Sequence, residues 1–333
     1  MVRALRVYSE TLPYDVVTQP KTLALLASRS LEVVLAVRPW QLAPLGGAAR
    51  ALRDAGIPLS VWPMISDEEG RWASAQNAGA FVRFVRTVAD ALDANGVPPR
   101  ELLIDLEPPF AQARALASAN VGGQSSRAVL AAAEARREKA ETLFGRASAE
   151  LAGAVRELHD RGIATSSAVW PLVALDPPDG RGWQALLGTP VDALATGRVS
   201  VMMYTSILEG WSRGALRRRD VAALLARATV RAVRRWDARA GVSVGCVGTG
   251  AFEDEPTYRD PSELAEDVAL VRAAGCEDLS LFDLGGVLAR PPAEAWLDAF
   301  VHGAEPGGHV TSKRVAAARR LARVATWALG RRR

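Results

Sequence analysis

Eight short apolar runs, separated by longer segments with helical periodicity, constrain the fold of this 333-residue chain more than any other feature. The runs are rich in Val, Ile and Leu, and most lack the alternation of a strand with one buried face. Continuous runs of this kind are typical of parallel strands that are buried on both sides. They predict strands at residues 4–10, 31–37, 58–65, 101–107, 162–170, 199–205, 242–248 and 278–284.

Helical patterns fill the intervals, at about residues 20–29, 46–55, 75–95, 126–160, 180–188, 215–239, 261–275 and 292–302. Eight strands that alternate with eight helices predict an α/β fold of the (β/α)8 TIM barrel type. The main alternative, an open doubly wound sheet, usually carries a Gly-rich phosphate loop after its first strand. Here that position reads "ETLPYD", without glycine, so the barrel is favoured. The long stretch at 126–160 could project from it.

A break at residues 305–309, "EPGGH", separates the predicted barrel, residues 1–304, from a basic tail. The last 23 residues contain one Lys, seven Arg and no acid, and removing these eight from the 41 basic residues leaves 33 against 37 acidic residues. Because the barrel itself is acidic, we do not expect it to bind nucleic acid. Apolar residues recur at helical spacing in 311–333, which predicts either a basic amphipathic helix in weak contact with an anionic membrane or a solvated terminus.

The sequence shows no apolar stretch of the length of a signal peptide or a membrane span. We therefore expect a cytoplasmic protein, peripheral at a membrane if the tail binds one. Cys246 and Cys276 lie in or beside apolar runs, so buried thiols are expected rather than a disulfide. No metal-type Cys and His spacing is present, and no cofactor or metal is expected.

In a barrel of this type the active site lies at the carboxyl ends of the strands, so the residues that follow each run are the functional candidates. Carboxylates and aromatic residues dominate these positions, and histidine is absent from them. This composition argues against a His-ligated metal and against a Ser-His triad. It suits a carbohydrate, whose C–H faces stack on aromatic rings and whose hydroxyls bind acids. The candidate substrate-binding residues are Glu10, Arg38, Trp62, Trp72, Trp170, Glu253 and Asp283.

The fourth run, "ELLIDLEPPF" at 101–110, ends in two acids. Residues two apart on a strand share a face, so Asp105 and Glu107 are both predicted to point into the barrel mouth. Two neighbouring acids in an apolar setting cannot both ionise freely, and at least one pKa should rise. A carboxylic acid that stays protonated near neutral pH can protonate a glycosidic oxygen. The alternative is structural, with Glu107 in an ion pair, for example with Arg38, and Asp105 hydrogen-bonded to a loop.

The segments "IDLE" and, two predicted strands later, "MMYT" resemble the chitinase-like family 18 glycoside hydrolases. In that family the fourth strand ends in Asp-x-Glu and the sixth carries Met-x-Tyr-Asp. The resemblance implies that Glu107 is the general acid. It also implies that Asp105 orients a substrate acetamide acting as internal nucleophile, and that Tyr204 hydrogen-bonds this acetamide.

Three other hypotheses stay open. "LEPP" is similar to the Asn-Glu-Pro of a large group of retaining glycosidases, whose nucleophile is a Glu on the seventh strand, here Glu253 or Glu255. A catalytically silent carbohydrate-binding barrel would keep the aromatic residues without the chemistry. A metal-dependent lyase or isomerase would use carboxylates at the mouth, namely Glu10, Asp105, Glu107 and Asp283. The leading hypothesis is an enzyme, an O-glycosyl hydrolase acting on a carbohydrate.

Overall fold

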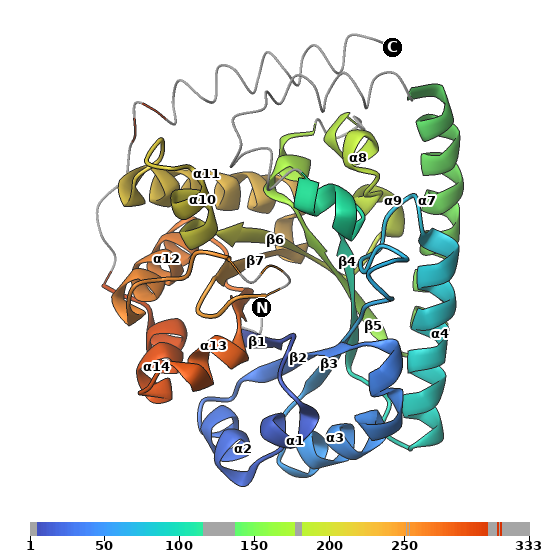
Figure 1. The fold of residues 1–333 in the computed structure, drawn as a ribbon, viewed down its shortest axis with the longest axis horizontal. Helices are drawn as coiled ribbons and strands as arrows, with labels where there is room; N and C mark the ends of the chain where they lie inside the picture. Colours follow the sequence, from blue (N-terminus) through green and yellow to red (C-terminus); the bar gives the residue numbers. More distant parts are fainter. Residues whose placement is uncertain are drawn as a thin grey trace.

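The computed structural model describes residues 5–115, 137–176, 182–250, 252, 254–305, 312 and 314. Eight parallel strands pair in sequence order and close into a barrel, with helices arranged around it (Figure 1). The predicted (β/α)8 barrel is therefore confirmed, and each predicted run overlaps one strand, although β6 and β7 begin one and two residues before their predicted runs. The strands are β1 Leu5–Ser9, β2 Glu32–Val37, β3 Leu59–Pro63, β4 Glu101–Leu106, β5 Ala164–Val169, β6 Arg198–Tyr204, β7 Ala240–Gly245 and β8 Leu279–Phe282.

The longer helices occupy the predicted intervals, and short helices join them. The longer ones are α2 Pro20–Ala27, α3 Leu42–Asp54, α4 Ala78–Ala94, α7 Arg137–Asp160, α11 Arg218–Trp236, α12 Pro261–Ala273 and α14 Ala293–His302. The shorter ones are α1 Tyr14–Val17, α8 Gly182–Leu187, α9 Val191–Leu194, α10 Thr205–Trp211 and α13 Leu284–Ala289, with 3-10 turns η1 Pro39–Gln41, η2 Pro171–Leu175 and η3 Asp237–Arg239.

Helix α7 lies beside α4 along one flank of the barrel (Figure 1). It buries Leu151, Val155 and Leu158 in the core. On its outer side, Arg86 of α4 donates two hydrogen bonds to the Glu157 carboxylate, at 2.8 and 2.7 Å. The described part of the 126–160 segment therefore packs on the barrel, and the expectation that it could project is wrong for this part. Its apolar stripe accounts for the packing, because a stripe of this kind needs a partner.

Alternation along the strands separates two apolar layers. One set of side chains, such as Val7, Leu35 and Val61, packs outward against the helices. The other set fills the barrel interior. Since successive side chains on a strand point to opposite faces, every second residue points into the barrel interior, up to the carboxyl ends of the strands. The interior set is Tyr8, Val34, Ala36, Trp62, Met64, Trp72, Leu103, Ala113, Ala168, Cys246 and Phe282.

The amino-terminal end of the barrel interior is closed by ion pairs. Arg6 lies 2.8 Å from Asp278 and 3.1 Å from Glu32. Arg198 lies 2.9 Å from Glu101 and 3.0 Å from Asp278. These five residues, called the amino-terminal layer below, are buried or largely buried. They come from β1, β2, β4 and β6 and from the position directly before β8.

Little of the basic tail lies within the described residues. Ser312 donates a hydrogen bond of 2.5 Å to Asp220 of α11, and Arg314 donates one of 3.0 Å to the carbonyl of Ala215. The other tail residues, and with them the expected membrane contact, lie outside the described part. Within that part, no helix is both long and apolar enough to span a bilayer.

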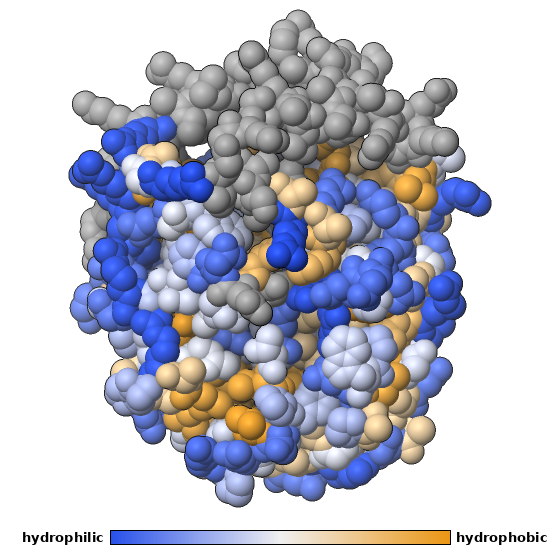
Figure 2. Space-filling view, in the orientation of Figure 1, coloured by the Kyte–Doolittle hydropathy of each residue, from blue (hydrophilic) through white to orange (hydrophobic). Residues whose placement is uncertain are grey.

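Two smaller features concern the surface and the thiols. Figure 2 shows mainly hydrophilic residues on the described surface of this face, with apolar residues in separate groups. Cys246 and Cys276 are buried free thiols, as predicted.

Candidate active site

Five carboxyl groups gather at the carboxyl end of the barrel. Asp105 lies near the carboxyl end of β4, and the other four follow β1, β4, β7 and β8. This places all five at one mouth, because parallel strands end on the same side. All five have raised pKa values, with burial as the largest cause in each. This group, called the carboxylate cluster below, consists of Glu10, Asp105, Glu107, Glu255 and Asp283.

Glu107 is held by an aromatic donor. The indole N–H of Trp170, at the end of β5, donates a hydrogen bond of 2.6 Å to one carboxylate oxygen of Glu107. Burial raises the pKa of Glu107 to about 7, the bond from Trp170 and the charge of Arg71 act against this rise, and the charge of Glu255 adds to it. Trp170 therefore positions a carboxyl group that changes protonation near neutral pH.

Asp105 lies deeper in the barrel. Its side chain is 1% exposed, and neither of its oxygens has a hydrogen-bond partner within the described part of the chain. Burial raises its pKa well above the usual value, and the charges of Glu107 and Glu10 raise it further. The indole N–H of its neighbour Trp62 acts against this rise, although neither group makes a well-formed hydrogen bond. Asp105 thus lies between Trp62 and Glu107, with its carboxyl oxygens short of full hydrogen bonding.

Tyr204 ends β6 and faces the same space. Its ring lies 5.3 Å from that of Phe282. Burial raises the pKa of Tyr204 well above 10, and the charges of both Asp105 and Glu107 contribute to the rise. The structure therefore brings together the three residues predicted to be catalytic.

The other acids of the cluster have individual partners. Burial raises the pKa of Glu10 to about 8, although Arg71 lies 3.3 Å away. One oxygen of Asp283 accepts the Gly286 N–H at 2.9 Å and caps α13, whereas the other has no described partner. Burial raises the pKa of Asp283 to about 6.

Glu255 enters the cluster from the loop after β7. It accepts the Gly250 N–H at 2.5 Å, and burial raises its pKa to about 7. The predicted Glu253 lies outside the described residues. Gly250 itself is needed for close packing, since a Cβ there would lie 2.7 Å from Glu10 and 2.5 Å from Phe282. Glycine at this position therefore permits a close approach.

Arg71 was not among the predicted site residues. Its guanidinium binds Asp67 through two bonds of 2.8 and 2.7 Å and also lies against Glu10. Its backbone adopts φ 58°, a left-handed conformation that is uncommon outside glycine. Gly70 before it has φ 107°. The segment "SDEEGRW", with an Arg after Gly, was the available signal, but its backbone conformation could not be derived from the sequence.

Arg38 and Trp72, two of the predicted substrate-binding residues, both contact neighbouring side chains. Arg38 pairs with Asp67 at 2.6 Å, so the alternative in which it pairs with Glu107 is wrong. The reason is geometric, because Asp67 on the loop after β3 lies nearer to the end of β2. The rings of Trp62 and Trp72 are each 4% exposed and pack among other side chains.

Aromatic contacts join loops from separate parts of the mouth. Phe110, after β4, stacks on Phe252, after β7, with ring centres 5.5 Å apart and planes at 8°. Trp72 and Trp211 flank this pair at 5.7 and 6.1 Å. Since β4 and β7 are not neighbours in the barrel, this contact spans the mouth.

Metal ligands do not converge within the described part. No group of three or more His, Cys, Asp or Glu residues there could hold a metal ion. The four acids of the metal-dependent hypothesis are close enough to influence one another, yet they do not form such a group.

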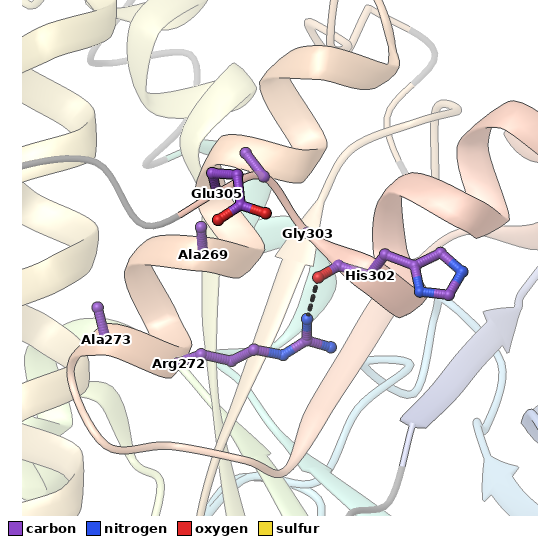
Figure 3. A pocket seen from close by; sticks show the side chains of 7 residues that line it. Ala269, Arg272, Ala273, His302, Gly303 and Glu305 are labelled. Atoms are coloured by element: carbon purple, nitrogen blue, oxygen red, sulfur yellow. Dashed lines mark hydrogen bonds between the residues drawn. The ribbon is translucent and has the colours of Figure 1, made fainter.

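A depression elsewhere on the barrel is separate from this site. It lies between the ends of α12 and α14, and Arg272 donates a 2.7 Å hydrogen bond to the His302 carbonyl within it (Figure 3). A second bond of 2.9 Å reaches the Val301 carbonyl. Arg272 therefore satisfies carbonyls at the end of α14, at the barrel end opposite the carboxylate cluster.

Comparison with known proteins supports the fold. No family model and no curated protein sequence matches the chain. Among solved structures, the PgaB (BpsB) glycoside hydrolase domain from Bordetella bronchiseptica is 13% identical, with a TM-score of 0.52 over 92% of this chain and 100% of that chain. A chitinase from Chromobacterium violaceum is 16% identical, with a TM-score of 0.49 over 90% and 99%. At such identities the first likeness shows the barrel fold alone.

Proposed function

We propose that this protein is a glycoside hydrolase-like enzyme in which Glu107 is the general acid. The observation that carries the proposal is the environment of Glu107. Burial raises the pKa of its carboxyl group to about 7, and the indole N–H of Trp170 donates a hydrogen bond of 2.6 Å that holds this group in place. A general acid works best when its pKa lies near the working pH. The barrel of similar fold in Bordetella bronchiseptica is a glycoside hydrolase domain, which is compatible with this role.

The first step is a proton transfer. The Glu107 carboxyl proton moves to the glycosidic oxygen, and the bond from this oxygen to the anomeric carbon breaks with the electron pair going to the oxygen. A substrate N-acetyl group supplies the nucleophile, as its carbonyl oxygen bonds to the anomeric carbon. Water then opens the ring so formed and gives its proton to the Glu107 carboxylate, which restores the acid.

Asp105 and Tyr204 would hold the acetamide during these steps. Asp105 has two buried oxygens without a described partner, and a carboxyl group keeps an acceptor oxygen in either protonation state. The N–H of a substrate acetamide would donate a hydrogen bond to one of these oxygens. Tyr204 faces the same space and, because its pKa is raised well above 10, keeps its hydroxyl proton for donation to the acetamide oxygen.

The test is hydrolysis of an oligosaccharide panel by the wild type and by Glu107→Gln. Gln cannot donate a proton, so we expect kcat on N-acetylated glycans to fall by about 10²- to 10⁴-fold, with glycan binding retained. Product release is followed by chromatography, and binding by calorimetry. Glu294→Gln, an exposed acid on α14, is the matched control and should act as the wild type.

Two outcomes would contradict the proposal. Binding without hydrolysis by the wild type on every glycan would identify a carbohydrate-binding barrel. Hydrolysis that is lost on chelation would instead favour the metal-dependent hypothesis. Equal hydrolysis of glycans with and without N-acetyl groups would keep Glu107 as the acid but move the nucleophile to a protein carboxylate, with Glu255 as the described candidate.

A further inference from the structure

We propose that the exposed indole of Trp40 is a remote binding platform for a saccharide chain whose reacting bond lies at Glu107. The inference rests on the proposed function and extends it to a substrate class, a polysaccharide or long oligosaccharide. Trp40 belongs to η1, directly after β2, and so lies at the same end of the barrel as the carboxylate cluster.

Exposure distinguishes Trp40 from the other large apolar residues. Its side chain is 68% exposed, and within the described ranges only Leu143 on α7, at 40%, is a second exposed large apolar residue. Three tryptophans inside the mouth, by contrast, are buried or already bonded to another side chain. Trp62 and Trp72 are buried, and Trp170 is bonded to Glu107. Trp40 is therefore the most exposed of the described tryptophans.

Trp40 is also held in place. The Arg38 guanidinium lies 4.7 Å from the centre of its ring, a cation–π contact that covers part of the indole. Arg38 is itself fixed, because it pairs with Asp67 at 2.6 Å and its backbone N–H donates to the Gln41 side chain at 2.8 Å. A ring that is already ordered loses little conformational entropy when a ligand stacks on it.

A continuous set of contacts leads from this ring to the cluster. Arg38 binds Asp67, Asp67 binds Arg71 at 2.7 Å, and Arg71 lies 3.3 Å from Glu10. Three side chains thus stand in series between Trp40 and the acids. A short saccharide at Glu107 would not reach Trp40, whereas a longer chain would cross this polar rim, whose arginines and aspartate can bind its hydroxyls.

The experiment measures affinity against chain length without turnover. Chitin, mannan and cellulose oligosaccharides, from disaccharide to hexasaccharide, are titrated by calorimetry into Glu107→Gln and into Glu107→Gln carrying Trp40→Ala. An aromatic stacking contact is worth a few-fold to about 10-fold in affinity. We expect Trp40→Ala to weaken the longest oligosaccharides by about 3- to 10-fold and to leave the disaccharide unchanged.

Leu143→Ala in the same background is the matched control and should bind every length as its parent does. Equal weakening of all lengths, or unchanged affinity for the longest, would overturn the role of Trp40 and leave the proposed function standing. Failure of every oligosaccharide to bind Glu107→Gln would overturn both proposals together.

Discussion

The two ends of the barrel interior contain the same kinds of residue in opposite electrostatic states. In the amino-terminal layer, burial raises the pKa of Glu101, but the charges of Arg198 and Arg6 outweigh it and the pKa is lowered overall. In the carboxylate cluster, Asp105 of the same strand and Glu107, directly after it, have raised pKa values. Four to six positions along the chain therefore separate a stabilised carboxylate from two carboxyl groups that resist ionisation.

The supply of arginine explains the difference. Arg6 and Arg198 project from β1 and β6 into the amino-terminal layer, where three acids share them. At the opposite end, Arg71 is the one cation among the main described causes that set the pKa of Glu107. It also forms an ion pair with Asp67. Paired buried charges are compatible with a stable fold. A buried acid without a partner destabilises the fold, but its raised pKa allows it to transfer protons near neutral pH.

The largest expected effect breaks the paired end. Arg198→Met leaves Glu101 and Asp278 without a close guanidinium, and removing one partner of a buried pair typically costs about 3–5 kcal/mol. We expect the free energy of unfolding, measured by denaturant titration, to fall by about that amount. Arg53→Met, at an exposed arginine of α3, should change it by less than about 0.5 kcal/mol. A loss below about 1 kcal/mol for Arg198→Met would mean that the layer does not depend on this pair.

The strand pattern made much of this comparison predictable. Continuous apolar runs gave the eight strands and their order, and alternation placed Asp105 and Glu107 in the interior together. These features depend on local sequence, namely side-chain period and strand length. The cap of α12 is equally local, since Asp260 accepts the N–H of Ser262, two residues further on, at 2.9 Å.

Pairing between loops was not predictable in the same way. Arg38, whose pairing with Glu107 was one alternative, binds Asp67, and Arg71 enters the site through a left-handed backbone at φ 58°. Glu255 joins the cluster because the Gly250 N–H binds it. Each depends on the path of a long loop in three dimensions, which strand period and residue type do not determine.

The second prediction sharpens the contrast through pH. The folded pKa of Glu10 is about 8, and those of Glu107 and Glu255 are about 7, all above the unfolded value near 4.5. The folded state therefore holds more protons than the unfolded state between these limits, so raising the pH favours unfolding. We expect the free energy of unfolding to fall by at least about 3 kcal/mol between about pH 5 and pH 8. A pKa difference of one between the two states corresponds to about 1.4 kcal/mol, so this is the share of one group whose folded pKa lies two units above pH 5.

Glu10→Gln tests the assignment of that slope. The amide does not titrate, so denaturant titrations at a series of pH values should give a shallower fall than the wild type. Glu294→Gln, outside the cluster, should keep the wild-type slope. Stability that stays constant across this window in the wild type would show that the cluster is ionised and solvated.

The smallest expected effect concerns the guanidinium of Arg71, whose charge lowers the pKa of Glu107. Glu107 must be protonated to act, so kcat/KM should fall as the pH rises through its pKa of about 7. The positive charge of Arg71 lowers this pKa, together with the hydrogen bonds from Trp170 and Asp105, whereas burial and the charge of Glu255 raise it. Arg71→Met should therefore move the alkaline fall of kcat/KM to higher pH, by up to about one pH unit.

Arg71→Lys separates charge from shape. It keeps the positive charge but cannot make the two parallel bonds to Asp67, so we expect a smaller alkaline displacement of the midpoint than for Arg71→Met. A lower rate with an unchanged midpoint in both variants would mean that Arg71 only holds the loop after β3. A displaced midpoint in Arg71→Met alone would show that one charge accounts for part of the difference between the two ends of the barrel.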